Sequence, residues 1–209
     1  MKHAASVLGV KTLMELLNLA CASGLLGSNL DGYDLDSWDL WRHSLAVAEG
    51  ARLVAKKCDP GLVEEAFSAG LIHDVGKIIL SPYILERKRA FDDLLQSDGE
   101  TFLDAEKTVL GFDHSEIAAE VCAQWNMPES IAVAIANHHT PEKADGNRLA
   151  HIIHIADAAA IMSGIGAGFD GMKYEISPAT LERLHVTEDD INAFMGEAAI
   201  YVDKTMAEL

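Results

Sequence analysis

Aromatic residues are scarce in this chain. Only 6% of its 209 residues are Phe, Trp or Tyr, although apolar residues make up 49%. Leu, Ala, Ile and Val supply most of the apolar content, and no stretch alternates strictly over the length of a strand. Leucine and alanine favour helices, whereas aromatic residues are enriched in strands. We therefore expect an all-α protein.

Cysteine is also sparse. The three cysteines, Cys21, Cys58 and Cys122, lie far apart, and no two of them form a Cys-x-x-Cys pair. An odd, scattered set argues against a disulfide framework and against a thiolate zinc site. We interpret them as reduced, small apolar residues of a cytoplasmic protein.

Long apolar runs are missing. No stretch approaches the ~20 apolar residues that a membrane-spanning helix needs. Residues 4–27 are fairly apolar, but Lys11 and Glu15 interrupt them. This pattern indicates an amphipathic helix over about 7–23 instead of a signal peptide.

Positive charge is scarce as well. The chain has 16 Lys and Arg residues against 33 Asp and Glu residues, which gives a formal net charge of −17. A surface this acidic repels nucleic acids and anionic membranes, so we expect neither as a partner. A small phosphorylated ligand is compatible with this charge if bound metal ions supply local cations.

Helical spacing and end signals divide the chain into helices. Ser37 is a suitable N-cap for the second helix, and Asp59-Pro60-Gly61 ends it. Further helices are expected over about 62–71, 84–95, 100–110, 115–125, 128–139 and 148–163, and the last two begin at Ser177-Pro178 and at the capping-box pair Thr187 and Asp190. We interpret Gly76 as a turn and residues 164–168 as a flexible connector. Predicted core residues are Phe67, Leu71, Ile72, Val75, Ile117, Val121, Trp125, Ile131, Ile135, Ile152 and Ile155.

Histidines and aspartates recur in an ordered series along these helices. Imidazole nitrogens and carboxylate oxygens suit iron, manganese, zinc or nickel. Each residue alone has an ordinary structural explanation, so the inference depends on the whole set. The series comprises His43, His73-Asp74, Lys77, His114, His138-His139 and Asp157.

This series resembles the signature of HD-superfamily metal-dependent phosphohydrolases, and the surrounding segments are most similar to HDOD signalling domains. The similar segments cover most of the chain from about residue 4. They are Ala5–Gly9, Leu40–Leu45, Ala69–Lys77, Asp113–Glu116, Trp125–Pro128, Asn137–His139 and Ile155–Asp157.

The resemblance implies an HD-domain helical bundle and a ligand for each position. His43, His73, Asp74 and Asp157 would hold a first divalent transition metal ion. Asp74 would bridge to a second ion held by His114 and His138, with His139 as a further ligand.

The second half of this set resembles that of HD-GYP cyclic-di-GMP phosphodiesterases. Lys77 would contact substrate phosphate, so the resemblance implies that Asp74 and Lys77 act in catalysis. Asp39, four residues before His43, is a further acidic candidate. The Gly-Tyr-Pro motif is absent after His139.

The remaining histidines have other expected roles. His151 and His154 share a helix with Asp157, and we interpret them as core or surface residues, with His154 alternatively a hydrogen-bonding partner of a metal ligand. His3 and His185 are expected to be solvated.

The resemblance also suggests a division of the chain. We expect an N-terminal helix and loop over 1–36, a remnant of the first HDOD lobe. The metal-binding core would cover 37–165, and a C-terminal helical extension would pack on it over 166–209.

Three functions remain open at this stage. The favoured one is metal-dependent hydrolysis of a phosphoester or phosphodiester, of the nucleotide or cyclic-dinucleotide class, in signal transduction. The alternative is a non-catalytic HDOD-type scaffold that binds a signalling protein, and a homodimer is compatible with either role. The third is a plain helical module with incidental histidines.

Overall fold

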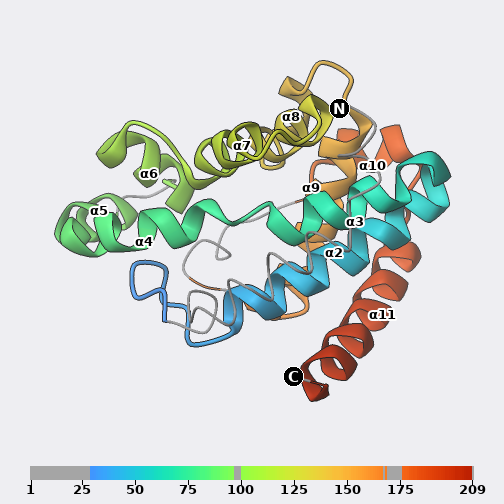
Figure 1. The fold of residues 1–209 in the computed structure, drawn as a ribbon, viewed down its shortest axis with the longest axis horizontal. Coiled ribbons are helices and arrows are strands. Elements are labelled where there is room, and N and C mark those ends of the chain that lie inside the picture. Colours follow the sequence, from blue (N-terminus) through green and yellow to red (C-terminus); the bar gives the residue numbers. More distant parts are fainter. Residues whose placement is uncertain (1–28, 97–99, 167, 169–175, 209) are drawn as a thin grey trace.

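The structure is a computed structural model that describes residues 29–96, 100–166, 168 and 176–208 (Figure 1). Its secondary structure is helical, and the only β-pairing among these residues is an isolated bridge between Leu30 and Leu35. The expected all-α class is confirmed. The expected helix over 7–23, with Cys21 and His3, lies outside the described residues.

The described helices follow one another along the chain. They are α2 (Asp39–Cys58), η1 (Pro60–Leu62), α3 (Val63–Ile72), α4 (Gly76–Glu86), α5 (Lys88–Leu95), α6 (Phe102–Leu110), α7 (His114–Gln124), α8 (Glu129–Ala136), η2 (Pro141–Lys143), α9 (Arg148–Met162), α10 (Pro178–Leu184) and α11 (Glu188–Ala207).

The main core is built around α2, which packs against α3, α9 and α11. Its buried side chains come from positions as distant as Trp41 and Val202. The segment after 166 therefore shares one core with the segment before it, while the division into domains stays a prediction. A second, smaller core includes Tyr33, Leu80 and Phe102, under α4, α5 and α6. In Figure 1 these three helices form a lobe at one end of the molecule.

Local signals fix most helix ends. Thr187 and Asp190 form the expected capping box of α11, and Ser177 caps α10 through the backbone N–H of Thr180. The expected N-cap of α2 is wrong. Helix α2 begins at Asp39, and the Ser37 hydroxyl donates to Asn29 Oδ1 at 2.9 Å instead of capping the helix.

The expected helix over 84–95 is also wrong in part. The chain forms two helices there, α4 and α5, which are separated at Arg87. Gly76 is the first residue of α4 and does not form the expected turn. A Cβ atom at Gly76 would lie 2.0 Å from the carbonyl oxygen of His114, so glycine is needed for the close approach of α4 to α7.

Most of the predicted core is confirmed. The prediction is wrong for Trp125, whose side chain is 47% exposed, because α7 ends at Gln124 and the indole follows the last helical turn. Val75, Ile117 and Val121 are half-buried. The buried members are Phe67, Leu71, Ile72, Ile131, Ile135, Ile152 and Ile155.

Two cysteines fall within the described residues, and both are free thiols. Cys122 is buried, and this burial raises its pKa to about 12, as fits an inert apolar residue. Cys58 is half-buried. Among the described residues, no helix combines the length and the apolar run that crossing a membrane would take.

Candidate metal centre

Six helices bring the predicted ligands to one place. His43 lies on α2, and Asp157 lies on α9. His73 and Asp74 sit where α3 gives way to α4, and His114 opens α7. His138 and His139 follow the end of α8. All are buried except His139, which is partly exposed.

Three of these residues form a first cluster, His43, His73 and Asp157, whose potential ligand atoms lie within 4.8 Å of one another. His43 Nε2 is 3.0 Å from Asp157 Oδ1, and His73 Nε2 is 3.7 Å from the same oxygen. One metal ion fits between such atoms, because Zn–N and Zn–O bonds are about 2 Å long.

Three other residues form a second cluster, His114, His138 and His139, which meets the same 4.8 Å limit. The Nε2 atoms of His114 and His139 are 2.8 Å apart. Two imidazoles at this distance share one proton or one cation, since two bare lone pairs would repel each other.

Asp74 lies between the two clusters. Its Oδ2 is 3.3 Å from His73 Nε2 and 3.6 Å from His43 Nε2. Its Oδ1 is 3.4 Å from His114 Nε2 and 3.9 Å from His138 Nε2. One carboxylate therefore faces both clusters, each with a different oxygen, which is the arrangement of a bridging ligand.

The far side of each ring is held in place. His73 Nδ1 donates to the carbonyl of Gly70 at 2.8 Å, and His138 Nδ1 donates to that of Ile135 at 2.7 Å. His43 Nδ1 is 3.1 Å from the Ile165 carbonyl. An imidazole that donates through Nδ1 keeps the Nε2 lone pair for a metal ion. These contacts thus aim three Nε2 atoms into the centre.

The residues present fit a metal ion. His73 Nε2 and Asp74 Oδ1 are buried and have no hydrogen-bond partner among the described residues. Buried polar atoms without hydrogen bonds are costly, so they mark a place where another partner belongs. A set of imidazole and carboxylate donors suits iron, manganese, zinc or nickel.

The electrostatics agree with a cation at this place. Burial alone would raise the pKa of Asp74, but His73 and Lys77 hold that pKa well below its usual range. Burial alone would lower the pKa of His73, but Asp74 and Asp157 raise it to about 10. The centre therefore attracts protons without a metal, and a bound ion would displace them.

Two imidazoles of the second cluster, His138 and His139, behave differently. Burial and the neighbouring His73 together lower the pKa of His138 to about 3. Burial and His138 likewise hold the pKa of His139 well below its usual range. Both rings are neutral at pH 7, which is the protonation state that binds metal.

Lys77 is buried in the first turn of α4. Its Nζ is 2.5 Å from Asp74 Oδ2 and 5.7 Å from the centre of the Tyr33 ring. The ammonium therefore lies at the centre, beside the carboxylate that faces both clusters. Its expected role on substrate phosphate stays a prediction.

Three further candidates lie outside the clusters. Asp39 Oδ2 accepts from the backbone N–H of Asp36 at 3.0 Å, and Asp39 belongs to none of the ligand groups found among the described residues. His151 is buried and is 2.8 Å from Thr180 Oγ1. His185 is exposed, as expected.

His154 is a buried core residue, as one interpretation expected, and it also contacts a predicted ligand. Its Nδ1 donates to the carbonyl of His138 at 2.8 Å, and its Nε2 accepts from the backbone N–H of Ser177 at 3.0 Å. The ring is buried and so helps to place the backbone of a predicted ligand.

The interpretation of residues 164–168 as a flexible connector is wrong for its described part. Gly166 has φ +64, and a Cβ atom there would lie 2.4 Å from the Asp39 carbonyl oxygen and 2.7 Å from His43 Cβ. The segment packs against α2, and its Ile165 carbonyl meets the His43 ring. Gly166 therefore serves close packing at the first cluster.

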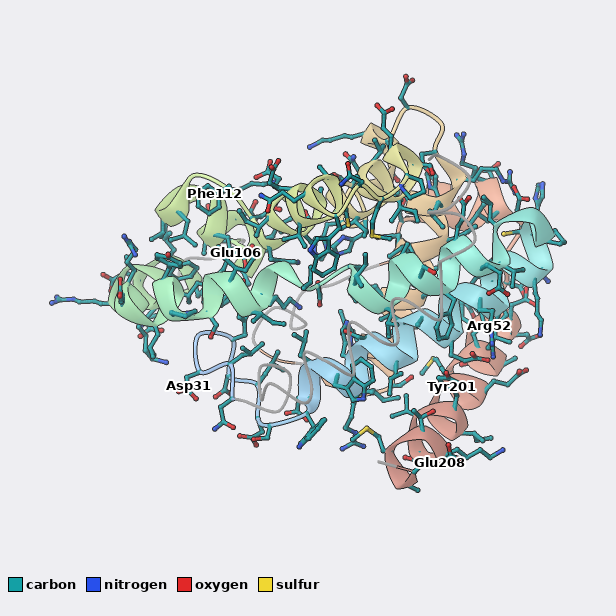
Figure 2. The ribbon with its side chains drawn as sticks, in the orientation of Figure 1. Asp31, Arg52, Glu106, Phe112, Tyr201 and Glu208 are labelled. Carbon is teal, nitrogen blue, oxygen red and sulfur yellow. The ribbon has the colours of Figure 1, made fainter. Side chains whose placement is uncertain are left out.

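Sequence reasoning missed Glu106, a fully buried carboxylate on α6. Its Oε2 is 2.9 Å from His114 Nδ1. A signal was available: Glu106 occupies the fourth position after Phe102 in the stripe Phe102, Ala105, Glu106 and Val109, whose other members are apolar. In Figure 2 Glu106 lies inside the lobe of α4, α5 and α6, whereas Asp31, Phe112 and Glu208 lie at the periphery.

Comparisons with known proteins agree with this architecture. Residues 1–141 match the model of the HDOD domain family. Ribonuclease Y of Mycoplasma mycoides is 29% identical over 160 residues, which cover 76% of this chain and 29% of that protein. The chain thus spans less than a third of this relative.

Solved structures also share the fold. An HDOD domain protein of unknown function from Geobacter sulfurreducens has a TM-score of 0.58 and 25% identity, over 82% of this chain and 60% of that one. A candidate phosphohydrolase from Shewanella amazonensis SB2B has a TM-score of 0.52 and 22% identity, over 77% of this chain and 63% of that one. The family match covers more than half of the sequence, and the chain belongs to the HDOD domain family.

Proposed function

We propose that this HDOD domain is a metal-dependent phosphohydrolase that acts on a phosphoester or phosphodiester of the nucleotide or cyclic-dinucleotide class in signal transduction. The observation that carries the proposal is the position of Asp74, one carboxylate that faces two clusters of potential ligands. A structural metal site needs only one closed set of about four ligands, whereas bridged pairs of ions are typical of phosphoester hydrolysis.

The geometry suggests a role for each of the predicted site residues. His43, His73 and Asp157 would hold one divalent ion, and His114, His138 and His139 would hold the other. When bound, such ions polarise phosphoryl oxygens and activate water at neutral pH. Lys77 Nζ lies 2.5 Å from Asp74 Oδ2, so its ammonium would be near a phosphate bound to metal ions that Asp74 holds.

The comparisons support the reaction class. A relative named ribonuclease Y and a neighbour described as a candidate phosphohydrolase both point to phosphate esters. The net charge of −17 argues against a long RNA substrate for this chain, because each added phosphate increases the repulsion. A small phosphorylated ligand, handled in the cytoplasm, is therefore the proposed substrate.

A hydrolysis assay tests the proposal. The Mn²⁺-loaded protein is offered bis(p-nitrophenyl) phosphate and cyclic-di-GMP, and His73→Ala is expected to lose at least ~100-fold in rate. His151→Ala is the matched control, because it also removes a buried imidazole, but one outside the clusters. Equal rates for His73→Ala and the parent would refute the enzyme proposal.

A non-catalytic scaffold that binds a signalling protein is the second candidate. The burial of the centre favours it, since His43, His73, His114 and His138 are nearly inaccessible and only His139 of the ligands is partly exposed. Tight Mn²⁺ binding with no turnover across a phosphoester panel would favour the scaffold.

A further inference from the structure

Glu106 holds one predicted ligand in two ways. Its Oε2 accepts from the backbone N–H of His114 at 2.9 Å, and the same oxygen is 2.9 Å from His114 Nδ1. His114 is the first residue of α7, so its N–H has no partner within the helix. One carboxylate therefore fixes both the backbone and the ring of the same residue.

Tyr33 holds Glu106 in turn. The Tyr33 hydroxyl donates to Glu106 Oε1 at 2.5 Å, and both side chains are fully buried. The Tyr33 ring packs against Phe102, with ring centroids 5.2 Å apart. The hydroxyl is thus anchored in the small core, and Glu106 has little freedom to move away from His114.

This arrangement differs from that of the first cluster. His43 and His73 are held through neutral backbone carbonyls, those of Ile165 and Gly70. His114 is held through a carboxylate. A hydrogen bond to an ionised acceptor is stronger than one to a neutral carbonyl, and it makes the imidazole a better metal ligand.

We propose that Glu106, fixed by the Tyr33 hydroxyl, is a positioning residue that aims and polarises His114 for the second of two metal ions. This inference rests on the metal site of the proposed function, but not on turnover. It predicts that binding of the second ion depends on Glu106 and that binding of the first ion does not. The reason is that, among the described residues, the Glu106 carboxylate bonds to Tyr33 and His114 and not to the first cluster.

Titration with Mn²⁺ alone tests the proposal, with the bound metal counted by elemental analysis. The parent is expected to bind two ions per chain. Glu106→Gln keeps the shape of the side chain and removes its charge. It should lower the affinity for the second ion by ~10-fold or more and leave the affinity for the first ion within about twofold of the parent. Tyr33→Phe should lower the affinity for the second ion by a smaller factor.

Glu49→Gln is the matched control. Glu49 is a buried glutamate on α2 that pairs with Arg52 at 2.6 Å, away from both clusters. It reports the cost of removing any buried carboxylate and should bind both ions like the parent. Circular dichroism checks that each variant is folded. If Glu106→Gln does not fold, Tyr33→Phe serves as the test variant.

A second readout separates positioning from general destabilisation. Long-range ¹⁵N NMR of labelled histidines, recorded with diamagnetic Zn²⁺ in place of Mn²⁺, should show His114 with its proton on Nδ1 in the metal-loaded parent and a changed pattern in Glu106→Gln. The proposal is overturned if Glu106→Gln binds both ions like the parent or loses both equally. A parent that binds no Mn²⁺ would overturn the proposed function as well. Selective loss of the second ion in a protein without turnover would remove the enzyme proposal and leave this inference standing.

Discussion

Replacing Gly76 with alanine should push α4 away from α7 and open the metal centre between them. A Cβ atom at this position would lie 2.0 Å from the carbonyl oxygen of His114 and 2.9 Å from its carbonyl carbon. Contacts between carbon and a carbonyl oxygen are normally about 3.3 Å or longer, so the two backbones must separate by roughly 1 Å. No flexible side chain can absorb the shift, because the atoms that clash belong to the backbone.

The consequences for stability and for the site follow from position. Overpacking of this kind costs about 1–3 kcal/mol of the free energy of unfolding. Asp74 lies two residues before Gly76, and its Oδ1 is 3.4 Å from His114 Nε2. Separation of α4 and α7 lengthens this distance, so the affinity of the second cluster for Mn²⁺ should fall by ~10-fold or more.

Urea unfolding followed by circular dichroism measures the first effect, and Mn²⁺ titration measures the second. Gly196→Ala is the matched control, because a Cβ atom there meets nothing within 4 Å on the exposed face of α11. That variant should gain about 0.5–1 kcal/mol, since alanine is favoured over glycine within a helix. An unchanged unfolding midpoint and metal affinity for Gly76→Ala would refute the packing argument.

Three smaller predictions accompany this one. Gly166→Ala should lower the affinity of the first cluster for Mn²⁺ by about tenfold, because the new Cβ would lie 2.7 Å from His43 Cβ and φ at this position is +64. An unchanged Mn²⁺ titration would contradict this. Burial alone would raise the pKa of Asp113, but its hydrogen bond with Lys107 lowers that pKa. The ionised side chain therefore stabilises the fold above the pKa of the unfolded chain, about 3.9, and this stabilisation is lost as pH falls through the lower pKa of the folded chain. Asp113→Asn should therefore cost about 1 kcal/mol at pH 7 and less at pH 3, and a constant difference in urea unfolding would disprove it. Thr187→Ala should cost about 1 kcal/mol through the lost cap of α11, and an unchanged thermal midpoint would rule it out.

Local signals account for what could be predicted about the helices. The capping box of Thr187 and Asp190 and the cap at Ser177 depend on residues three positions apart, so the sequence contains both partners. Ser37 shows the limit of this reasoning. It has a suitable side chain, but its hydroxyl bonds to Asn29, and nothing near Ser37 in the sequence indicates that choice.

For the candidate site, too, the sequence indicated some features and not others. Residue type and order singled out a series that includes His43, His73, Asp74 and Asp157, because few side chains can bind a metal, and the resemblance to HD-superfamily proteins implied their roles as ligands. Their common location could not be derived from spacing, since Asp157 is separated from His43 by more than a hundred residues, yet the two side chains are 3.0 Å apart. Only the packing of α9 on α2 brings them together.

The sequence by itself determined the helical class, most helix ends and the set of residues able to bind metal, because these follow from side-chain chemistry and from neighbours along one helix. The tertiary structure alone decided the partner of Glu106, the close contacts of Gly76 and Gly166, and the exposure of Trp125. Each of these depends on which backbone or side chain from a distant segment occupies the adjacent space, and that is settled only when the helices pack.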